Sequence, residues 1–232
     1  MPRKPRFFLP DMPVHVVQRG HSRQPVFLED NDYCVYLGWL KEAAERYVCS
    51  IHAYVLMTNH IHILVTPEDK QGISLMMQYL GRRYVPYSNK IYGTSGSIWE
   101  GRFKSSLVSD DQYLFTCMRY IELNPVRSGM VRLPGQYAWS SYRANAQGKM
   151  NELITPHPLY DQLGKTKQCR LDAYKGLFKG HVDEEELVSI RNAWQTGTPL
   201  GNDRFKDLIE RKLKCKVGQD RRGRPSKVIE EE

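Results

Sequence analysis

Two histidines separated by one apolar residue form the first group whose spacing could support chemistry. The segment His60-Ile61-His62 lies in a run of apolar, partly β-branched residues, which favours a strand. Alternate residues of a strand share a face, so His60 and His62 point one way and Ile61 the other. Two imidazoles on one face can converge on a metal ion. The alternative is a pair of ordinary histidines, and a third ligand must come from elsewhere in the fold.

A tyrosine and an asparagine four residues apart form the second group. In a helix, Tyr120 and Asn124 share one face. A tyrosine held close to a metal-bound phosphate can attack the phosphorus, and an asparagine carbonyl oxygen one turn later can bind the same ion. Tyr120 is one of 14 tyrosines, so packing in the core is the alternative.

Basic and aromatic residues alternate over residues 99–104 (WEGRFK), beside a loop rich in glycine and serine. This pattern is typical of a strand that follows a nucleic-acid backbone and stacks bases on its aromatic rings. We therefore expect Arg102 and Lys104 to contact nucleic acid. An ordinary junction between a loop and a strand is the alternative.

The positive charge of the chain is concentrated near its C-terminus. The net charge is +8, and residues 211–227 alone hold eight basic residues and one acidic residue. Such a distribution indicates a polyanionic partner, most commonly nucleic acid. The segment from Arg222 to Pro225 (RGRP) resembles an AT-hook core, which lies in the minor groove of A·T-rich duplexes. Arg222 and Arg224 are predicted to contact duplex DNA, unless the tail is only a solvated basic segment.

Composition and segment lengths limit where the protein acts. The five cysteines include no C-x-x-C pair, which argues against a disulfide framework and for a reducing compartment. No apolar run approaches the roughly 18–20 residues of a membrane helix. The basic N-terminus is not followed by the apolar segment of a secretory signal. We expect a cytoplasmic protein without membrane contact.

The elements that must position these residues follow the order β-α-β-β-α-β-α. Strands are expected over residues 14–19, 51–57, 60–66 and 103–108, with a tight turn at Thr58-Asn59. Helices are expected over 31–48 with Asp30 as the cap, over 73–85 up to Pro86, and from Asp110-Asp111 to a boundary at Pro125. This order predicts an α+β fold, a ferredoxin-like antiparallel sheet with helices on one face.

The pattern changes after residue 143. We predict a catalytic domain over 1–143, a linker over 144–165, a helical extension over 166–214 and a basic, flexible tail over 215–232. The extension contains helical patterns near 167–178, 183–195 and 202–214, the last with Asn202 as its cap. The final two helices are either a DNA-reading helix–turn–helix or an ordinary amphipathic pair.

Several motifs together resemble a known family over roughly residues 8–143. The hairpin 58–64 (TNHIHIL) resembles the HUH motif, histidine-hydrophobic-histidine, of single-tyrosine HUH transposases. Residues 120–129 (YIELNPVRSG) resemble the tyrosine motif of their REP-associated branch. Residues 16–24 (VVQRGHSRQ), 99–103 (WEGRF) and 139–142 (WSSY) are similar to that branch as well. The motifs occur in the order that the family shows.

The resemblance implies an enzyme that cuts and rejoins single-stranded DNA near hairpins. It implies His60, His62 and Asn124 as ligands of Mg²⁺ or Mn²⁺, and Tyr120 as the nucleophile that forms a 5′-phosphotyrosine. Free tyrosine has a pKa near 10, so ionising it at pH 7 costs about 4 kcal/mol. The metal-held phosphate and Arg127 would offset part of that cost. The expected partner is single-stranded DNA with hairpins, bound by a monomer or homodimer.

Three other functions are weighed against this one. A hairpin-binding protein derived from a transposase would bind without cutting, although the four chemical residues argue against it. A metal-dependent phosphodiesterase would use metal-bound water, but no cluster of Asp and Glu accompanies the two histidines. An RNA-binding domain of the RRM kind needs aromatic side chains on a sheet face that the histidines occupy.

Overall fold

The first half of the chain alternates strands with helices. The computed structural model describes residues 6–109, 112–180 and 183–217. The elements are β1 (Val14–Arg19), α1 (Asp30–Arg46), β2 (Cys49–Met57), β3 (His60–Pro67), α2 (Gly72–Tyr92) and β4 (Lys104–Leu107). A short 3₁₀ helix, η1 (His21–Arg23), follows β1. All four strands lie within two residues of their predicted bounds.

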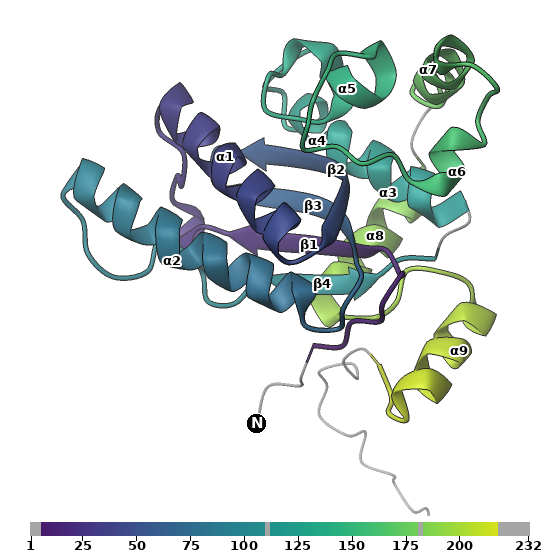
Figure 1. Cartoon of the computed structure of the whole chain (residues 1–232), viewed down its shortest axis with the longest axis horizontal. Coiled ribbons are helices and arrows are strands. Elements are labelled where there is room, and N and C mark those ends of the chain that lie inside the picture. The colour runs from purple at the N-terminus through teal and green to yellow at the C-terminus, as the bar shows by residue number, and fades with distance from the viewer. Residues whose placement is uncertain (1–5, 110–111, 181–182, 218–232) are drawn as a thin grey trace, which may run out of the picture.

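The four strands form one antiparallel sheet in the order β2-β3-β1-β4, in which β3 and β1 are central. Helices α1 and α2 lie across one face of this sheet (Figure 1). This order and layering confirm the predicted ferredoxin-like α+β fold. The register pairs Val17 with His62 and Arg19 with His60, so the last residue of β1 lies opposite the first residue of β3.

The face of the sheet under α1 and α2 is built from apolar side chains. Val16 of β1 and Ile61 and Ile63 of β3 are fully buried against these helices. Tyr36 of α1 and Tyr84 of α2 meet edge to face, with ring centroids 5.0 Å apart. Burial of large apolar side chains such as these supplies most of the stabilisation of a core.

Two helix boundaries differ from the predictions. Helix α1 has Glu29 rather than Asp30 as its N-cap, and the Asp32 carboxylate accepts hydrogen bonds from the backbone N–H groups of Leu28 and Glu29. Helix α2 continues through Pro86 and ends at Gly93, which has the left-handed φ of 64°. The missing N–H of Pro86 is tolerated because this residue lies on the exposed side of the helix.

The opposite face of the sheet is covered by helices from the second half of the chain. These are α3 (Gln112–Glu122), α4 (Asn124–Arg127) and, from the predicted extension, α8 (Glu184–Thr196). Helix α8 packs against β4, β1 and α3. Asp110-Asp111, the predicted start of α3, lies outside the described residues. The sheet is therefore covered on both faces, not on one face as predicted, because the extension supplies part of a second layer.

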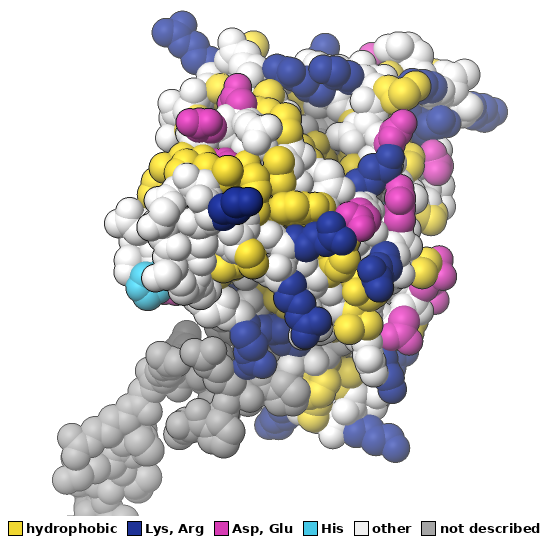
Figure 2. Space-filling model, turned by 60° about the vertical axis from the view of Figure 1, so that its left-hand side comes forward, with side chains coloured by type: hydrophobic (Ala, Val, Ile, Leu, Met, Phe, Trp, Pro, Cys, Tyr) yellow, Lys and Arg dark blue, Asp and Glu magenta, His cyan; other side chains and the backbone are white. Residues whose placement is uncertain are grey.

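Among the described residues, four of the remaining helices follow α4 along the chain and precede α8, and α9 follows α8 and packs on the core of the first layer. They are η2 (Pro134–Gln136), α5 (Tyr142–Gln147), α6 (Pro158–Asp161), α7 (Lys167–Gly176) and α9 (Asp203–Leu213). Helices α7, α8 and α9 match the three predicted helical patterns, and the Asn202 side chain caps α9 by accepting a hydrogen bond from the N–H of Phe205 at 2.9 Å. The face in Figure 2 shows Lys and Arg side chains in an interrupted band, with Asp and Glu mainly toward one edge.

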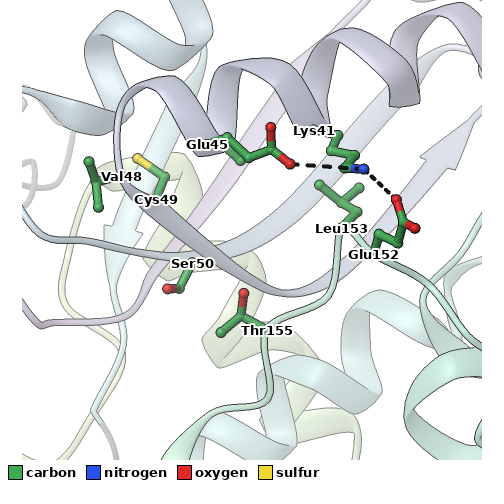
Figure 3. Close-up of a pocket in the computed structure, with 9 residues that line it drawn as sticks. Lys41, Glu45, Val48, Cys49, Ser50, Glu152, Leu153 and Thr155 are labelled. Atoms are coloured by element: carbon green, nitrogen blue, oxygen red, sulfur yellow. Dashed lines mark hydrogen bonds and ion pairs between the residues drawn. The ribbon is translucent and has the colours of Figure 1, made fainter.

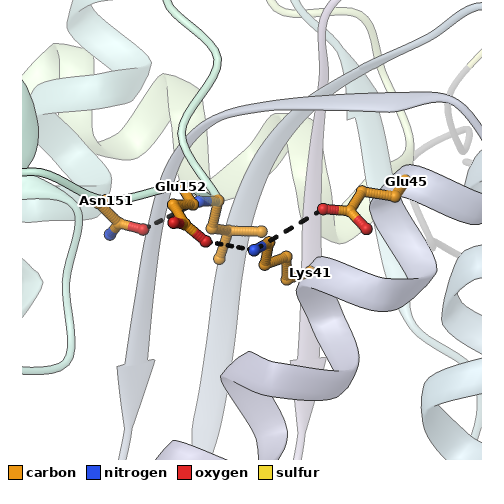
Figure 4. A network of polar contacts seen from close by, with 5 residues as sticks. Lys41, Glu45, Asn151 and Glu152 are labelled. Atoms are coloured by element: carbon orange, nitrogen blue, oxygen red, sulfur yellow. Dashed lines mark hydrogen bonds and ion pairs between the residues drawn. The ribbon is translucent and has the colours of Figure 1, made fainter.

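Residues 150–155 are anchored to the sheet and to α1. The N–H of Thr155 donates to the carbonyl oxygen of Ile51 at 2.8 Å, and Lys41 forms ion pairs with Glu45 and Glu152 (Figure 4). A hollow of about 190 Å³ lies beside these groups, between the end of α1 and this segment (Figure 3).

The division of the chain into domains stays a prediction. Among the described residues, no helix is long and apolar enough to cross a bilayer.

Candidate active site

The two histidines of β3 lie on the sheet face that α3 and α8 cover. Their ring centroids are 5.1 Å apart, with the rings at 80° to each other. His62 is only 2% exposed, whereas His60, at the start of the strand, is partly exposed. The alternation of the strand thus separates both imidazoles from Ile61, as the sequence predicted.

A third histidine, which the sequence analysis missed, joins this pair. His15 of β1 is fully buried, and its Nε2 lies 2.8 Å from Nδ1 of His62. The two rings stack with centroids 5.1 Å apart. The alternation of Val14-His15-Val16 could have placed His15 on this face. Its contact with His62 depends on the pairing of β1 with β3, which lies 47 residues away in the chain.

All three imidazoles are neutral at pH 7. Burial lowers the pKa of His15 to about 3 and that of His60 to about 4, with a smaller contribution at His60 from the charge of Arg19. Burial, with nearby positive groups, also holds the pKa of His62 well below its usual value. A neutral imidazole keeps a lone pair on one ring nitrogen, which is the form that can bind a metal.

The hydrogen bonds of the two β3 histidines use Nδ1 of each ring, and Nε2 carries the lone pair in the tautomer that donates from Nδ1. Nδ1 of His60 lies 2.7 Å from Oδ1 of Asn59, and Nδ1 of His62 is bonded to His15. In the described part of the chain, Nε2 of neither ring has a hydrogen-bond partner. Two neutral imidazoles with Nδ1 engaged suit a divalent ion. No group of three or more His, Cys, Asp or Glu side chains able to hold a metal occurs among the described residues.

Tyr120, in the last turn of α3, meets the histidines edge to face. Its ring centroid is 5.6 Å from that of His62 and 5.8 Å from that of His15, and its side chain is 4% exposed. The guanidinium carbon of Arg127 lies 4.2 Å from the centre of the tyrosine ring. Arg127 also donates from Nη2 to the carbonyl oxygen of Tyr120 at 2.7 Å. Burial lowers the pKa of Arg127 to about 10, which leaves it charged at pH 7.

Asn124 lies beyond a break in the helix. Helix α3 ends at Glu122, and α4 begins at Asn124 with Pro125 in its first turn. The predicted continuous helix from Tyr120 to Asn124 is therefore wrong, because the proline closes one helix and opens the next. The Asn124 side chain is buried and forms no hydrogen bond with any described residue. Its role as a third ligand stays a prediction.

The model of the family described as "Transposase IS200 like" matches residues 9–124, which is half of the chain and contains His15, the histidine pair and Tyr120. The chain belongs to this family. IS200-like transposases are DNA-processing enzymes, so the family agrees with the sequence resemblance.

Two relatives narrow the comparison. A Haemophilus influenzae protein (strain ATCC 51907 / DSM 11121 / KW20 / Rd) with the description "Putative REP-associated tyrosine transposase" is 26% identical over an alignment 121 residues long, and the match covers 47% of this chain and 68% of the relative. A solved REP-associated tyrosine transposase bound to a REP hairpin aligns with a TM-score of 0.54 at 18% identity. That match covers 68% of this chain and 93% of the solved chain, and it shows that the two share a fold.

The residues of this transposase that were predicted to contact nucleic acid are two basic residues near β4, the aromatic residues beside them, and two arginines near the C-terminus. Arg102 and Lys104 are exposed, and Lys104 Nζ lies 5.5 Å from the centre of the Trp194 ring. The neighbouring aromatic residues are not available to stack on bases: Trp99 packs on Tyr36 and Tyr84, and Phe103 packs on Phe8. That part of the prediction is wrong, because the aromatic side chains are needed for the core. Arg222 and Arg224 lie outside the described residues.

Helix α8 of the transposase contributes a residue that the sequence analysis missed. The ring of Trp194 is buried with its centroid 6.2 Å from that of His62, at 83°. Its Nε1 donor is buried without a partner among the described residues. The extension thus forms one wall of the candidate active site. One tryptophan in an amphipathic helix gives no sign of this contact in the sequence.

Glu122 lies between Tyr120 and Asn124 but faces away from the histidines. Its carboxylate accepts hydrogen bonds from Ser141 at 2.5 Å, from Asn145 at 2.9 Å and from Tyr174 at 2.9 Å. Burial outweighs these bonds and raises the pKa of Glu122 to about 7. This buried cluster fixes the end of α3 to α5 and α7, and the sequence analysis did not assign it a role.

Proposed function

We propose that this IS200-like transposase cleaves and rejoins single-stranded DNA beside hairpins, with Tyr120 as the nucleophile. The observation that carries the proposal is the contact of Tyr120 with His62, the buried member of the histidine pair on β3, with ring centroids 5.6 Å apart. Tyr120 of α3 and His62 of β3 thereby meet the requirement that a nucleophile lies beside a group that holds its phosphate.

The proposed step exchanges one phosphoester bond for another. The Tyr120 oxygen forms a bond to phosphorus and loses its proton, while the bond between phosphorus and the 3′ oxygen breaks. The 3′ oxygen takes up a proton and leaves as a hydroxyl, and the 5′ phosphate stays on the tyrosine. A 3′ hydroxyl can reverse the step, so rejoining needs no nucleotide cofactor. The charge of Arg127 over the ring stabilises negative charge on the phenol oxygen.

His60, His62 and Asn124 are the residues that would hold Mg²⁺ or Mn²⁺. When bound, the ion would polarise the scissile phosphate and stabilise the leaving oxygen. Imidazole ligands favour Mn²⁺ over Mg²⁺. The low pKa of both histidines keeps one nitrogen of each ring unprotonated at neutral pH, and a neutral amide as third donor leaves the positive charge of the ion undiminished.

The proposed partner is single-stranded DNA that contains hairpins. The family supports DNA as the partner, and the solved relative is bound to a REP hairpin. Exposed Arg102 and Lys104 would contact the backbone near the site. Contact of Arg222 and Arg224 with duplex DNA, and the choice between monomer and homodimer, remain further predictions.

The test is incubation with hairpin-containing single-stranded DNA from near the gene, with Mn²⁺ or Mg²⁺, followed by a denaturing gel. We expect a covalent adduct that Tyr120→Phe abolishes. Tyr47→Phe, on the face under α1 and α2, is the matched control and should keep the adduct. Cleavage that survives Tyr120→Phe would instead indicate a phosphodiesterase that uses metal-bound water. Binding of several hairpins without cleavage by the wild type would indicate a hairpin-binding protein.

A further inference from the structure

The turn between β2 and β3 carries an asparagine whose two amide atoms have different partners. Oδ1 of Asn59 lies 2.7 Å from Nδ1 of His60. Nδ2 of the same side chain donates to the carbonyl oxygen of Arg23 at 3.0 Å. Asn59 therefore joins a candidate metal ligand to the segment that follows β1.

The partners of Asn59 determine where the proton of His60 lies. A backbone carbonyl oxygen only accepts hydrogen bonds, so the amide atom facing Arg23 must be the nitrogen. The atom facing His60 is then the amide oxygen, which also only accepts. Nδ1 of the neutral His60 ring must therefore carry the hydrogen, and Nε2 must carry the lone pair. This assignment follows from complementarity of donors and acceptors alone.

The segment held by the other end of Asn59 has an unusual backbone. Ser22 and Arg23 are consecutive residues with positive φ, 49° and 60°, which side chains other than glycine rarely adopt. A Cβ on Gly20 would lie 2.3 Å from the carbonyl oxygen of Gln24, so only glycine fits at this position. The N–H of Gly20 donates to the carbonyl oxygen of Asn59 at 2.8 Å. The backbone and side chain of Asn59 together hold this loop, residues 20–24, against the start of β3.

We propose that Asn59 is a positioning residue that couples the histidine pair to loop 20–24. Its oxygen keeps His60 in the tautomer that presents Nε2 to the site. Its nitrogen holds the backbone of the left-handed Arg23, whose exposed side chain would serve as a cation for a DNA phosphate. This inference rests on the proposed function, in which His60 binds a metal ion and the protein binds DNA. The two hydrogen bonds of Asn59 can be tested without DNA cleavage.

Two substitutions separate the two ends of Asn59. Asn59→Asp keeps an acceptor for Nδ1 of His60 but places an oxygen against the Arg23 carbonyl. Asn59→Leu removes both bonds at similar size. Asn89→Leu is the matched control, because Asn89, which lies on α2, also donates to a carbonyl oxygen, that of Gly96, and accepts from the hydroxyl of Thr94.

The first measurement is ¹⁵N NMR of the histidine rings in the metal-free full chain. We expect the Nδ1–H tautomer of His60 in the wild type, in Asn59→Asp and in Asn89→Leu, and a mixture of tautomers in Asn59→Leu. A single Nδ1–H tautomer in Asn59→Leu would overturn the role of the amide oxygen. The measurement needs no cleavage, so it can succeed even if the adduct assay overturns the proposed function.

The second measurement is titration with Mn²⁺ alone, followed by electron paramagnetic resonance, and binding of single-stranded hairpin DNA. Asn59→Leu should weaken Mn²⁺ binding about 10–100-fold, the usual effect of removing a hydrogen-bond partner of a metal-binding histidine. Asn59→Asp should keep Mn²⁺ binding and lose DNA affinity to the same extent as Arg23→Ala. Unchanged Mn²⁺ affinity in Asn59→Leu, or unchanged DNA affinity in both Asn59→Asp and Arg23→Ala, would overturn the coupling.

Discussion

The two faces of the sheet differ in chemistry although the same strands build them. The face under α1 and α2 receives Val16, Ile61 and Ile63 and is closed by aromatic rings. The face under α3 and α8 receives His15, His60 and His62 from positions that alternate with these residues. The comparison shows how a strand with period two separates residues that stabilise the fold from residues that carry chemistry.

Among the described residues, both faces bury polar atoms without partners, the Tyr36 hydroxyl under α1 and α2 included, but several such atoms gather at one place on the histidine face. On the histidine face, Nδ1 of His15, Nη1 of Arg127 and Nε1 of Trp194 are buried without partners among the described residues. Buried polar atoms without partners cost stability. Their gathering around Tyr120 is typical of a site that is completed by a ligand.

Substitution of a histidine should show the largest effect, and mainly on activity. His60→Ala removes a candidate ligand from a partly exposed position and breaks one hydrogen bond. We expect adduct formation to fall by more than about 100-fold, because hydrogen-bond partners of metal ligands are alone worth about 10–100-fold. The free energy of unfolding, measured in urea, should change by about 1 kcal/mol. A much larger loss of stability would show that His60 stabilises the fold as residues of the other face do.

The neighbouring residue on the other face should behave in the opposite way. Ile61→Ala creates a cavity in the fully buried core under α1 and α2. We expect the free energy of unfolding to fall by about 2–5 kcal/mol, as measured by urea denaturation. Below the unfolding transition, the variant should still form the adduct. Loss of the adduct in a fully folded Ile61→Ala protein would show that the two faces are not independent.

The buried Glu122, at the end of α3, makes the stability of the protein depend on pH. Burial raises the pKa of Glu122 from 4.5 to about 7, so the folded state holds this proton more tightly than the unfolded state. Stability is therefore lost as pH rises from about 4.5 to about 7, by about 3 kcal/mol in total. Glu122→Gln cannot ionise and should lack this loss. Urea denaturation of both proteins at pH 5 and pH 8 measures their free energies of unfolding. An equal change between the two pH values in both proteins would contradict the raised pKa of Glu122.

The smallest effect is expected at the exposed rim. Arg102→Ala should reduce the salt dependence of single-stranded DNA binding by about 0.7 in the slope of log K against log salt, the value of one phosphate contact. Arg82→Ala, an exposed arginine on α2, is the control on the other face and should leave the slope unchanged. Equal effects of the two variants would mean that arginines on both faces contribute equally to DNA binding.

Local patterns in the sequence were sufficient for much of the fold. Alternation of apolar residues predicted the strands, and the two residues Thr58-Asn59 predicted the turn that joins β2 to β3. The spacing of His60 and His62 predicted their common face. These features depend on residues within one or two turns of each other, where backbone geometry leaves few choices. Pro86 was misread because its exposure, which makes the missing N–H harmless, is set by the packing of α2.

The sequence alone determined that two histidines share a strand face and that a tyrosine motif follows on a helix. Only the tertiary structure decided that His15 bonds to His62, that Trp194 of α8 closes the site and that Glu122 joins three helices. Glu122 is 19 to 52 residues away along the chain from the residues that donate to it, and His15 is 47 residues away from His62. Such contacts follow from the order of strands in the sheet and the packing of helices on it, which no local pattern contains.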